Sequence, residues 1–239
     1  MRALTRPDPG PRRQWAPHGV SMAVVPDLSR MRRDYGGRGL REEDLAGGWV
    51  ELFDRWFADA VAAELPEPNA MVLATTDADG APDARIVLMK GYDAFGFVFV
   101  TSYASAKGAQ LAVNPRAALV FPWHALQRQV RVAGRVERVG DAASDDLWTP
   151  RPRGAQIAAV ASVQSTVVDS REELEARVRL LDEETGPGKV PRPPVWGGYR
   201  VVPERVEFWQ GGANRLHDRF VFVRDDEEGG GWIVQRLAP

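Results

Sequence analysis

The side chains best suited to chemistry gather between residues 207 and 219. After a strand-like end at Trp209 and the pair Gly211-Gly212 comes a dense polar set: Asn214, Arg215, His217, Asp218 and Arg219. Guanidiniums and an imidazole beside an indole favour a planar anionic ligand, because guanidinium forks bind anions and indole rings stack. The glycine pair would let the backbone approach such a ligand closely. A charged hairpin loop explains the same composition about equally well.

A second set of cations could hold phosphate groups. Its members are Arg85 and Lys90 at the two ends of an apolar strand, Lys107, and Arg151 with Arg153 around Pro152. Lys107 follows Ser105, a candidate N-cap for a helix over residues 105–113. The free amides and dipole of a helix N-terminus attract phosphate. Taken singly, each feature is more often an ordinary capped helix or a surface cation.

The elements that would position these groups are mostly short strands joined by turns. Apolar runs predict strands at residues 70–75, 84–91, 97–101, 117–123, 128–139, 196–202, 205–209, 220–224 and 232–237. Residues 77–80 and 93–96 have turn chemistry, and crossover helices do not separate the early strands. The pattern therefore predicts a mainly β fold with peripheral helices, an antiparallel sheet closed into a barrel. A doubly wound parallel fold is disfavoured.

Helices and linkers complete the expected organisation. Apolar residues recur at helical spacing over residues 49–64, and two further helices are expected at residues 156–163 and 170–184. Residues 186–194 are a proline-rich extended connector. Residues 1–28 lack periodicity and read as a disordered tail, which leaves residues 29–239 as a single domain.

Composition excludes several classes of function. The net charge of -2 gives no global basic field for nucleic acid, and the chain has no cysteine for disulfides or thiolate metal sites. The three histidines lie far apart without ligand spacing, so no metal site is expected. No apolar run is long enough for a bilayer span, and no signal peptide is recognisable. These features predict a cytoplasmic protein that binds small anions.

Several ordered motifs together resemble one known family. They are Arg32-Arg33-Asp34-Tyr35, residues 85–90, Phe121-Pro122-Trp123, Arg151-Pro152-Arg153, Gln164-Ser165, Trp196-Gly197-Gly198-Tyr199, residues 207–219, and the terminal Arg236-Leu237-Ala238-Pro239. In this order they resemble pyridoxamine 5′-phosphate oxidases, FMN-dependent enzymes that form pyridoxal 5′-phosphate. The resemblance is nearly collinear from residue 31 to residue 239.

The resemblance implies a split β-barrel homodimer with FMN at each of two subunit interfaces. Flavin-binding residues carried over by motif are Arg85, Ile86, Val87, Leu88, Lys90, Thr101, Lys107, Gln129, Gln164, Ser165, Trp209 and Arg219. Substrate-binding residues would be Lys90, Arg151, Arg215, Leu216 and His217, with Arg32, Arg33, Asp34 and Tyr35 as a flap. Arg215 and His217 would be the catalytic pair, acting through orientation and electrostatics more than through proton abstraction.

The implied reaction oxidises the substrate carbon that bears the amine or alcohol. A hydride equivalent passes to flavin N5, the imine from the amine hydrolyses to the aldehyde, and dioxygen reoxidises the flavin with release of hydrogen peroxide. Four positions depart from the common family pattern: Val100, Ala106, Leu147 and Ala155. Each replaces a polar or charged side chain, and each missing contact could cost about 1 to 3 kcal/mol. Arg153 is a candidate to compensate at the substrate phosphate.

Two alternatives remain open at this stage. The weakened phosphate contacts also suit a split-barrel flavin oxidase of another aromatic metabolite, as in phenazine-type pathways. A non-catalytic protein that binds flavin or pyridoxal phosphate is the other. Turnover of the two phosphorylated vitamers separates all three.

Overall fold

A computed structural model of the chain describes residues 27–31, 33–225 and 230–239. The chain divides into two units, residues 1–34 and residues 35–239. In the first unit, the described residues include one short 3-10 helix, η1 (Leu28–Met31). The predicted tail lies almost wholly outside the described residues and stays a prediction.

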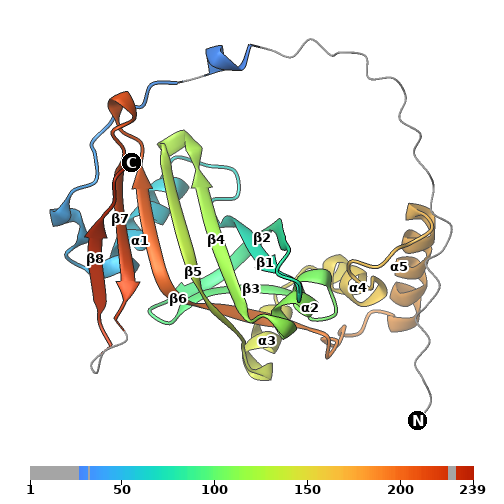
Figure 1. Cartoon of the computed structure of the whole chain (residues 1–239). Coiled ribbons are helices and arrows are strands. Elements are labelled where there is room, and N and C mark those ends of the chain that lie inside the picture. The colour runs from blue at the N-terminus through green and yellow to red at the C-terminus, as the bar shows by residue number, and fades with distance from the viewer. Residues whose placement is uncertain (1–26, 32, 226–229) are drawn as a thin grey trace. The chain divides into compact units, whose positions relative to one another are not determined.

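The second unit is built on one antiparallel sheet, shown in Figure 1. Its strands are β1 (Ala70–Thr76), β2 (Pro82–Asp93), β3 (Gly96–Ser102), β4 (Arg116–Trp123), β5 (Arg128–Arg138), β6 (Trp196–Gln210), β7 (Asp218–Arg224) and β8 (Trp232–Arg236). They lie in the order β3-β2-β1-β4-β5-β6-β7-β8, and a further β3–β6 pairing joins the first six into a closed barrel. β7 and β8 extend the sheet beyond β6. The predicted mainly β barrel with peripheral helices is confirmed.

The side chain of Asp77 stabilises the turn between β1 and β2. The Asp77 carboxylate accepts hydrogen bonds from the amides of Asp79 and Ala81, at 3.0 and 2.8 Å. Such an Asx turn reverses the chain within a few residues, so β1 and β2 pair from Thr76–Pro82 to Ala70–Leu88. The predicted turn at residues 77–80 therefore aligns the strand that carries Arg85.

Aromatic rings fill the barrel interior. The helix α1 (Gly48–Ala62) inserts Phe53, which is fully buried. Its ring contacts those of Phe97 and Phe121 edge to face at 4.9 and 5.1 Å between centroids. Edge-to-face aromatic packing of this kind gives the strands a rigid support. The helical pattern predicted at residues 49–64 is therefore core packing, as expected.

One strand is longer than the sequence indicates. Pro203 suggests a break between two strands, but β6 is continuous from Trp196 to Gln210. Arg205 pairs with Ala133 of β5 and Pro203 pairs with Gly134, so Glu204 is the extra residue of a bulge in β6 that accommodates the proline. β6 consequently runs from the helical side of the barrel to the loop at residues 211–217.

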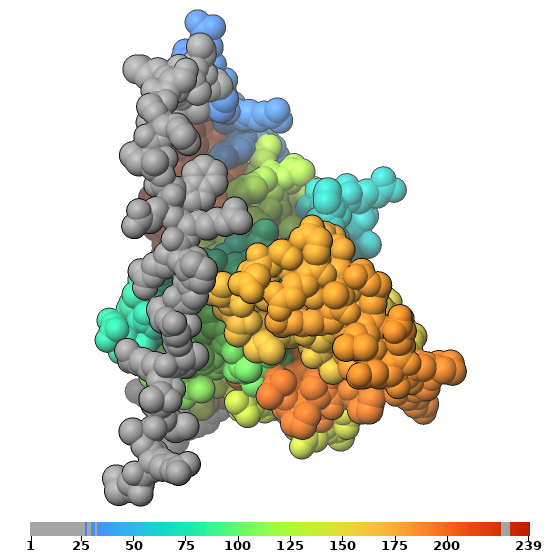
Figure 2. Space-filling view, turned by 90° about the vertical axis from the view of Figure 1, so that its right-hand side faces the viewer, coloured from blue at the N-terminus to red at the C-terminus, as the bar shows by residue number. Residues whose placement is uncertain are grey.

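The described part of the second unit contains four α-helices besides α1. They are α2 (Ala106–Val113), α3 (Asp141–Trp148), α4 (Arg153–Ala161) and α5 (Arg171–Thr185). The last three surround a second apolar cluster of Trp148, Ile157, Val190 and Trp196. Figure 2 shows α4 and α5, in yellow and orange, as one protruding mass. Sequence reasoning did not identify α3, whose residues are mostly small or acidic.

Three short 3-10 helices occupy connections: η2 (Glu42–Leu45), η3 (His124–Leu126) and η4 (Ala213–Arg215). Within the described ranges, no helix has both the length and the apolar character needed to cross a bilayer. The same residues contain no group of three or more His, Asp or Glu side chains arranged to hold a metal ion.

Candidate functional site

Nine of the predicted binding residues line one pocket of about 770 Å³. Its walls come from β2, β3, α2, α4, α5 and the first residue of β6. The predicted residues in this pocket are Arg85, Ile86, Val87, Leu88, Lys90, Thr101, Lys107, Arg151 and Gln164. A pocket of this volume is within the range of cofactor and drug-sized ligand sites. Four basic side chains around one pocket favour an anionic ligand.

Lys107 lies at the first turn of α2 and is only 9% exposed. Its Nζ donates to Thr101 Oγ1 at 3.3 Å and to Gln164 Oε1 at 3.4 Å. Burial lowers the pKa of the Lys107 ammonium, and the nearby positive charge of Arg85 lowers it further. A buried ammonium that has only neutral hydrogen-bond acceptors is suited to receive an anion.

The same end of α2 is capped as predicted. Ser105 is fully buried, its Oγ accepts from the Gly108 amide at 3.2 Å, and it donates to the Ser102 carbonyl at 2.7 Å. The cap fixes the direction of the first turn and leaves amides of that turn available at the pocket. Ala106 follows directly, so this turn contributes one cation instead of two.

A local network fixes the direction of Arg85. Its Nη1 donates to Thr75 Oγ1 at 2.6 Å, and its Nη2 contacts the Asp83 carboxylate at 2.5 Å. Gln110 on α2 accepts from both Thr75 and Arg85, at 2.6 and 3.2 Å. Sequence reasoning missed Gln110. An amide three residues beyond Lys107 on the same helix is its only signal.

Arg151 has a buried polar atom without a partner. Its Nε makes no hydrogen bond, and its Nη2 makes only a 3.4 Å contact with the Ala155 carbonyl. The guanidinium lies over the Trp196 ring at 5.0 Å, and burial lowers its pKa. Buried polar groups are nearly always satisfied, so this unmatched donor indicates a place for an anionic acceptor.

The departures from the family pattern lie in different places. Val100 and Ala155 line the pocket, whereas Leu147 packs into the second apolar cluster. Arg153, the residue expected to compensate for them, does not line the pocket in the described residues. Its guanidinium donates to the Gly188 carbonyl at 2.7 Å and to Asp182 at 2.9 Å, and so ties α4 to the end of α5.

One wall of the pocket is open in the single chain. Ile86 is 70% exposed although it lies in the middle of β2, and Lys90 is also exposed. Gln164 and Ser165 lie after α4, and Ser165 has a left-handed backbone with φ of 73°. Ser165 does not line this pocket in the described part of the chain.

Several other predicted residues form a second group at the β6–β7 hairpin. His217 lies 4.6 Å from the Trp209 ring and 5.7 Å from the Tyr35 ring, between centroids. The Arg215 guanidinium lies 5.8 Å from the Tyr35 ring. Leu216 is 72% exposed. The Tyr35 ring therefore lies near both the imidazole of His217 and the guanidinium of Arg215.

The two glycines are required by the protein itself. A Cβ on Gly212 would lie 2.0 Å from the Leu216 carbonyl, and one on Gly211 would lie 3.0 Å from the Tyr35 ring. The sequence suggested that these glycines let the backbone approach a ligand closely. In the structure they let it approach Leu216 and Tyr35 of the same chain. The stretch is a hairpin, as its structural interpretation predicts, and its role in ligand binding stays a prediction.

Gln129, Trp209 and Arg219 form one row across the sheet. Gln129 lies opposite Trp209 in the β5–β6 pairing, and Trp209 lies opposite Arg219 in the β6–β7 pairing. Directly opposed residues of an antiparallel pair project from the same face. Three residues predicted to bind flavin therefore share one face of the sheet, across β5, β6 and β7.

Glu207 holds the guanidinium of Arg219. The carboxylate is 1% exposed at the residue level and accepts from Arg219 Nε at 2.9 Å and Nη2 at 2.7 Å. Arg131 and Arg205 contact its other oxygen at 3.2 and 3.4 Å. Arg219 Nη1 donates to the Ala238 carbonyl at 2.9 Å. Sequence reasoning treated Glu207 only as the end of a strand.

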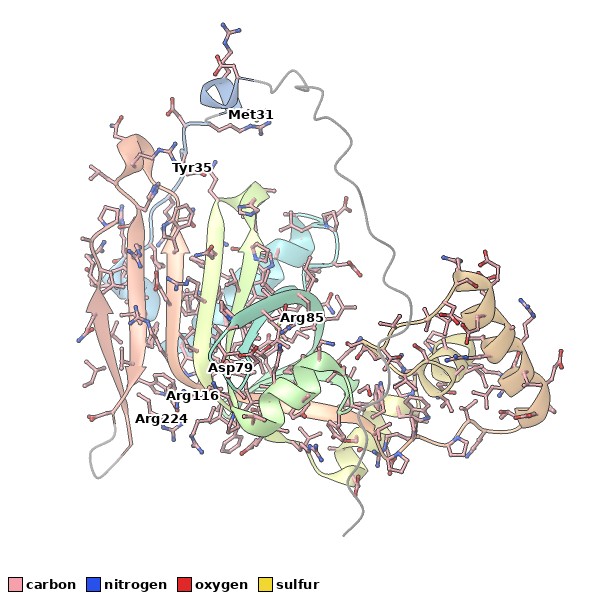
Figure 3. The ribbon with its side chains drawn as sticks, turned by 45° about the vertical axis from the view of Figure 1, so that its right-hand side comes forward. Met31, Tyr35, Asp79, Arg85, Arg116 and Arg224 are labelled. Carbon is pink, nitrogen blue, oxygen red and sulfur yellow. The ribbon has the colours of Figure 1, made fainter. Side chains whose placement is uncertain are left out.

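The two groups of residues do not meet within one chain. No residue of the hairpin loop lines the 770 Å³ pocket in the described ranges. Figure 3 shows Tyr35 at the end of the sheet beside the hairpin, and Arg85 elsewhere on the barrel wall. Of the predicted flap, Arg33 and Asp34 are exposed in the first unit, and Arg32 lies outside the described residues.

Comparison with known proteins identifies the family of this chain. Residues 57–183 match the family model described as pyridoxamine 5′-phosphate oxidase. The chain belongs to this family. Residues 196–239 match a second model, the pyridoxine 5′-phosphate oxidase C-terminal dimerisation region. The second match contains β6, β7, β8 and the hairpin loop.

Curated relatives of the family cover nearly all of the chain. It is 52% identical over 212 residues to the pyridoxine/pyridoxamine 5′-phosphate oxidase of Burkholderia cenocepacia (strain HI2424), covering 89% of this chain and 99% of the relative. It is 53% identical over 222 residues to the same-named protein of Salinispora arenicola (strain CNS-205), covering 92% and 99%.

Solved structures share the fold. PhzG from Burkholderia lata 383, in complex with tetrahydrophenazine-1-carboxylic acid, has a TM-score of 0.75 and 32% identity, covering 80% of this chain and 92% of that one. A pyridoxamine 5′-phosphate oxidase-related, FMN-binding protein of Nostoc punctiforme PCC 73102 has a TM-score of 0.63 at 18% identity, covering 78% and 97%.

Proposed function

We propose that this protein is an FMN-dependent oxidase that converts pyridoxamine and pyridoxine 5′-phosphates to pyridoxal 5′-phosphate. The observation that carries the proposal is a single pocket with two desolvated cations, Lys107 and Arg151. A flavin phosphate and a substrate phosphate need two such cations. The family match and the names of the relatives support the same reaction.

The residues of the pocket fit FMN. Lys107, Arg85 and the capped start of α2 would hold its phosphate, and the exposed wall at Ile86 is apolar enough to meet a flat ring system. When bound, the flavin would accept a hydride equivalent and pass its electrons to dioxygen, with release of hydrogen peroxide. Lys90 and Arg151 would bind and orient the substrate phosphate beside it.

The second half of the site would come from another copy of the chain. Trp209, Arg215 and His217 lie in the region that matches the dimerisation model, and they are apart from the pocket in one chain. In a symmetric dimer, each copy would bring its hairpin to the pocket of its partner. We propose that two copies thereby form two complete sites.

An absorption spectrum followed by an oxygen-uptake assay tests the function. The purified protein should be yellow, and it should consume oxygen and release peroxide with pyridoxamine 5′-phosphate. A yellow protein that is inactive on both phosphorylated vitamers would contradict the proposal and favour a binding protein.

A second candidate is an oxidase of another aromatic metabolite. The relationship to PhzG and the apolar residues Val100 and Ala155 in the pocket favour it. The cations Lys90 and Arg151 argue for a phosphorylated substrate instead. Peroxide release with a dihydro- or tetrahydrophenazine carboxylic acid, and none with either phosphorylated vitamer, would select this candidate.

Mixing two variants tests whether subunits share the site. Arg151→Met and Arg215→Met should each be nearly inactive at low substrate concentration. After joint refolding, about one quarter of the wild-type activity should return, since half of the dimers are mixed and each has one intact site. The control is the mixture of separately refolded homodimers, kept without exchange. Joint refolding that restores nothing would show that each site lies within one chain.

Loss of the α2 cap should weaken FMN binding. Ser105→Ala removes the acceptor for the Gly108 amide and should cost about 1 kcal/mol of unfolding free energy. Ser170→Ala is the matched control, because Ser170 caps α5 by accepting from the Glu173 amide at 3.1 Å. Urea unfolding and FMN titration should show a stability loss in both variants and weaker FMN binding only in Ser105→Ala. Equal FMN affinities would contradict the assignment of this helix end.

A further inference from the structure

The backbone of the hairpin loop fixes the orientation of the His217 ring. The Gly212 amide donates a hydrogen bond to His217 Nδ1 at 3.1 Å. A nitrogen that accepts a hydrogen bond presents its lone pair, so the proton of the neutral ring must lie on Nε2. Nδ1 is therefore occupied by the protein, and Nε2 is the nitrogen left for any other partner.

The loop conformation leaves little freedom for this contact to change. Asn214 and Arg215 both have left-handed backbones, with φ of 54° and 66°. The Leu216 amide donates to the Ala213 carbonyl at 3.0 Å. Residues other than glycine at position 212 would clash with the Leu216 carbonyl. Left-handed conformations of non-glycine residues persist only where the surrounding structure imposes them, and they are frequent at functional sites.

The surroundings keep the ring neutral. Burial lowers the pKa of His217, and the positive charge of Arg215 lowers it further. The other charged neighbour in the sequence, Asp218, is occupied: it accepts from the Leu40 amide at 3.1 Å and from Arg236 at 2.7 Å. Trp209 and Tyr35 are the aromatic groups that contact the ring. A protonated ring would also bring an Nδ1–H against the Gly212 N–H, two donors in one contact.

We infer that the Gly212 amide holds His217 as its Nε2–H tautomer, so that the imidazole acts as a hydrogen-bond donor to the substrate. This inference rests on the proposed function and specifies the chemistry of the same site. The substrate must then offer an acceptor atom within hydrogen-bond distance of His217 Nε2. In the neutral ring Nε2 already bears a proton, so it cannot act as a base that abstracts one from the substrate. Gly212 is a positioning residue, because it acts through His217.

The tautomer can be measured without activity. Long-range ¹H–¹⁵N spectra of the full-length protein, labelled at histidine, distinguish protonated from unprotonated ring nitrogens above the pKa of each ring. His217 should show Nε2 protonated and Nδ1 unprotonated, without exchange between tautomers. His124, which is exposed, is the internal control and should show averaged tautomers. A spectrum of His217 with Nδ1 protonated, or with averaged tautomers, would overturn the inference whether or not the protein is an oxidase.

Two substitutions separate the roles of the two nitrogens. The Asn in His217→Asn can still accept from the Gly212 amide but has no donor at the Nε2 position, whereas His217→Gln reaches that position with its amide NH₂. With pyridoxamine 5′-phosphate, kcat/KM should fall at least about tenfold in His217→Asn and less in His217→Gln, with equal FMN content. A loss in His217→Gln equal to or greater than that in His217→Asn would overturn the donor role. If the wild-type protein oxidises neither vitamer, the proposed function fails while the tautomer measurement still stands.

Discussion

Lys107→Met should weaken FMN binding by roughly 10- to 100-fold while making the protein without FMN more stable. The loss follows from removal of a charge-assisted hydrogen bond to phosphate, which is worth about 1.5 to 3 kcal/mol. Ala106 offers no second cation on this turn to replace it. The gain follows from burial, because methionine fills a similar volume without placing a charge in a desolvated position.

The stability of the FMN-free protein should also depend on pH through Lys107. The pKa of Lys107 is lower in the folded protein than in the unfolded chain. Between the two values the unfolded chain binds more protons, so the stability of the FMN-free protein should rise with pH across that window below 10.5. In Lys107→Met this rise of stability with pH should disappear. Urea unfolding at several pH values measures it.

Lys189→Met is the matched control for Lys107→Met. Lys189 is exposed in the proline-rich connector, away from the pocket lining in the described residues. The control should change neither FMN affinity, followed by quenching of flavin fluorescence, nor unfolding free energy beyond about 0.5 kcal/mol. Unchanged FMN affinity in Lys107→Met would mean that Lys107 does not contact the phosphate.

Much of the barrel could be predicted because its signals are local. Alternating apolar residues and the Asx turn at Asp77 specify neighbouring strands without reference to distant parts of the chain. The continuity of β6 could not be predicted, because it depends on how the residues around Pro203 pair with Ala133 and Gly134 of β5, where Glu204 of β6 has no partner residue. The helix α3 was missed since its burial depends on Trp148 contacts with Trp196, far along the chain.

The candidate site, too, could be predicted only as far as its signals are local in the sequence. Motifs pointed to Arg85, Lys107 and Arg151, and the structure places all three around one pocket. The groups that direct Arg85 and Arg219 were not visible in the sequence, because Gln110 and Glu207 acquire their roles only when strands and helices pack. Single-chain geometry also separates the hairpin from the pocket, a division that residue spacing does not reveal.

Arg151→Met should raise the KM for pyridoxamine 5′-phosphate by roughly 10- to 100-fold and leave FMN affinity unchanged. The guanidinium has an unmatched Nε donor and lies over Trp196, so a substrate phosphate would supply its missing acceptor. Steady-state oxygen uptake measures the effect. Pyridoxamine without phosphate should be oxidised equally slowly by both proteins, because it has no group for this contact.

Arg153→Met is the control that makes the Arg151 result specific. Arg153 carries the same group two residues away but binds Asp182 and the Gly188 carbonyl. Arg153→Met should therefore reduce the unfolding free energy and leave KM near the wild-type value. Arg151→Met should instead raise KM and leave the unfolding free energy nearly unchanged. The desolvated guanidinium of Arg151, whose pKa burial lowers, contributes little to folding. An increase in KM in both variants, or in Arg153→Met alone, would mean that the substrate phosphate binds at the α4–α5 junction and not specifically at Arg151.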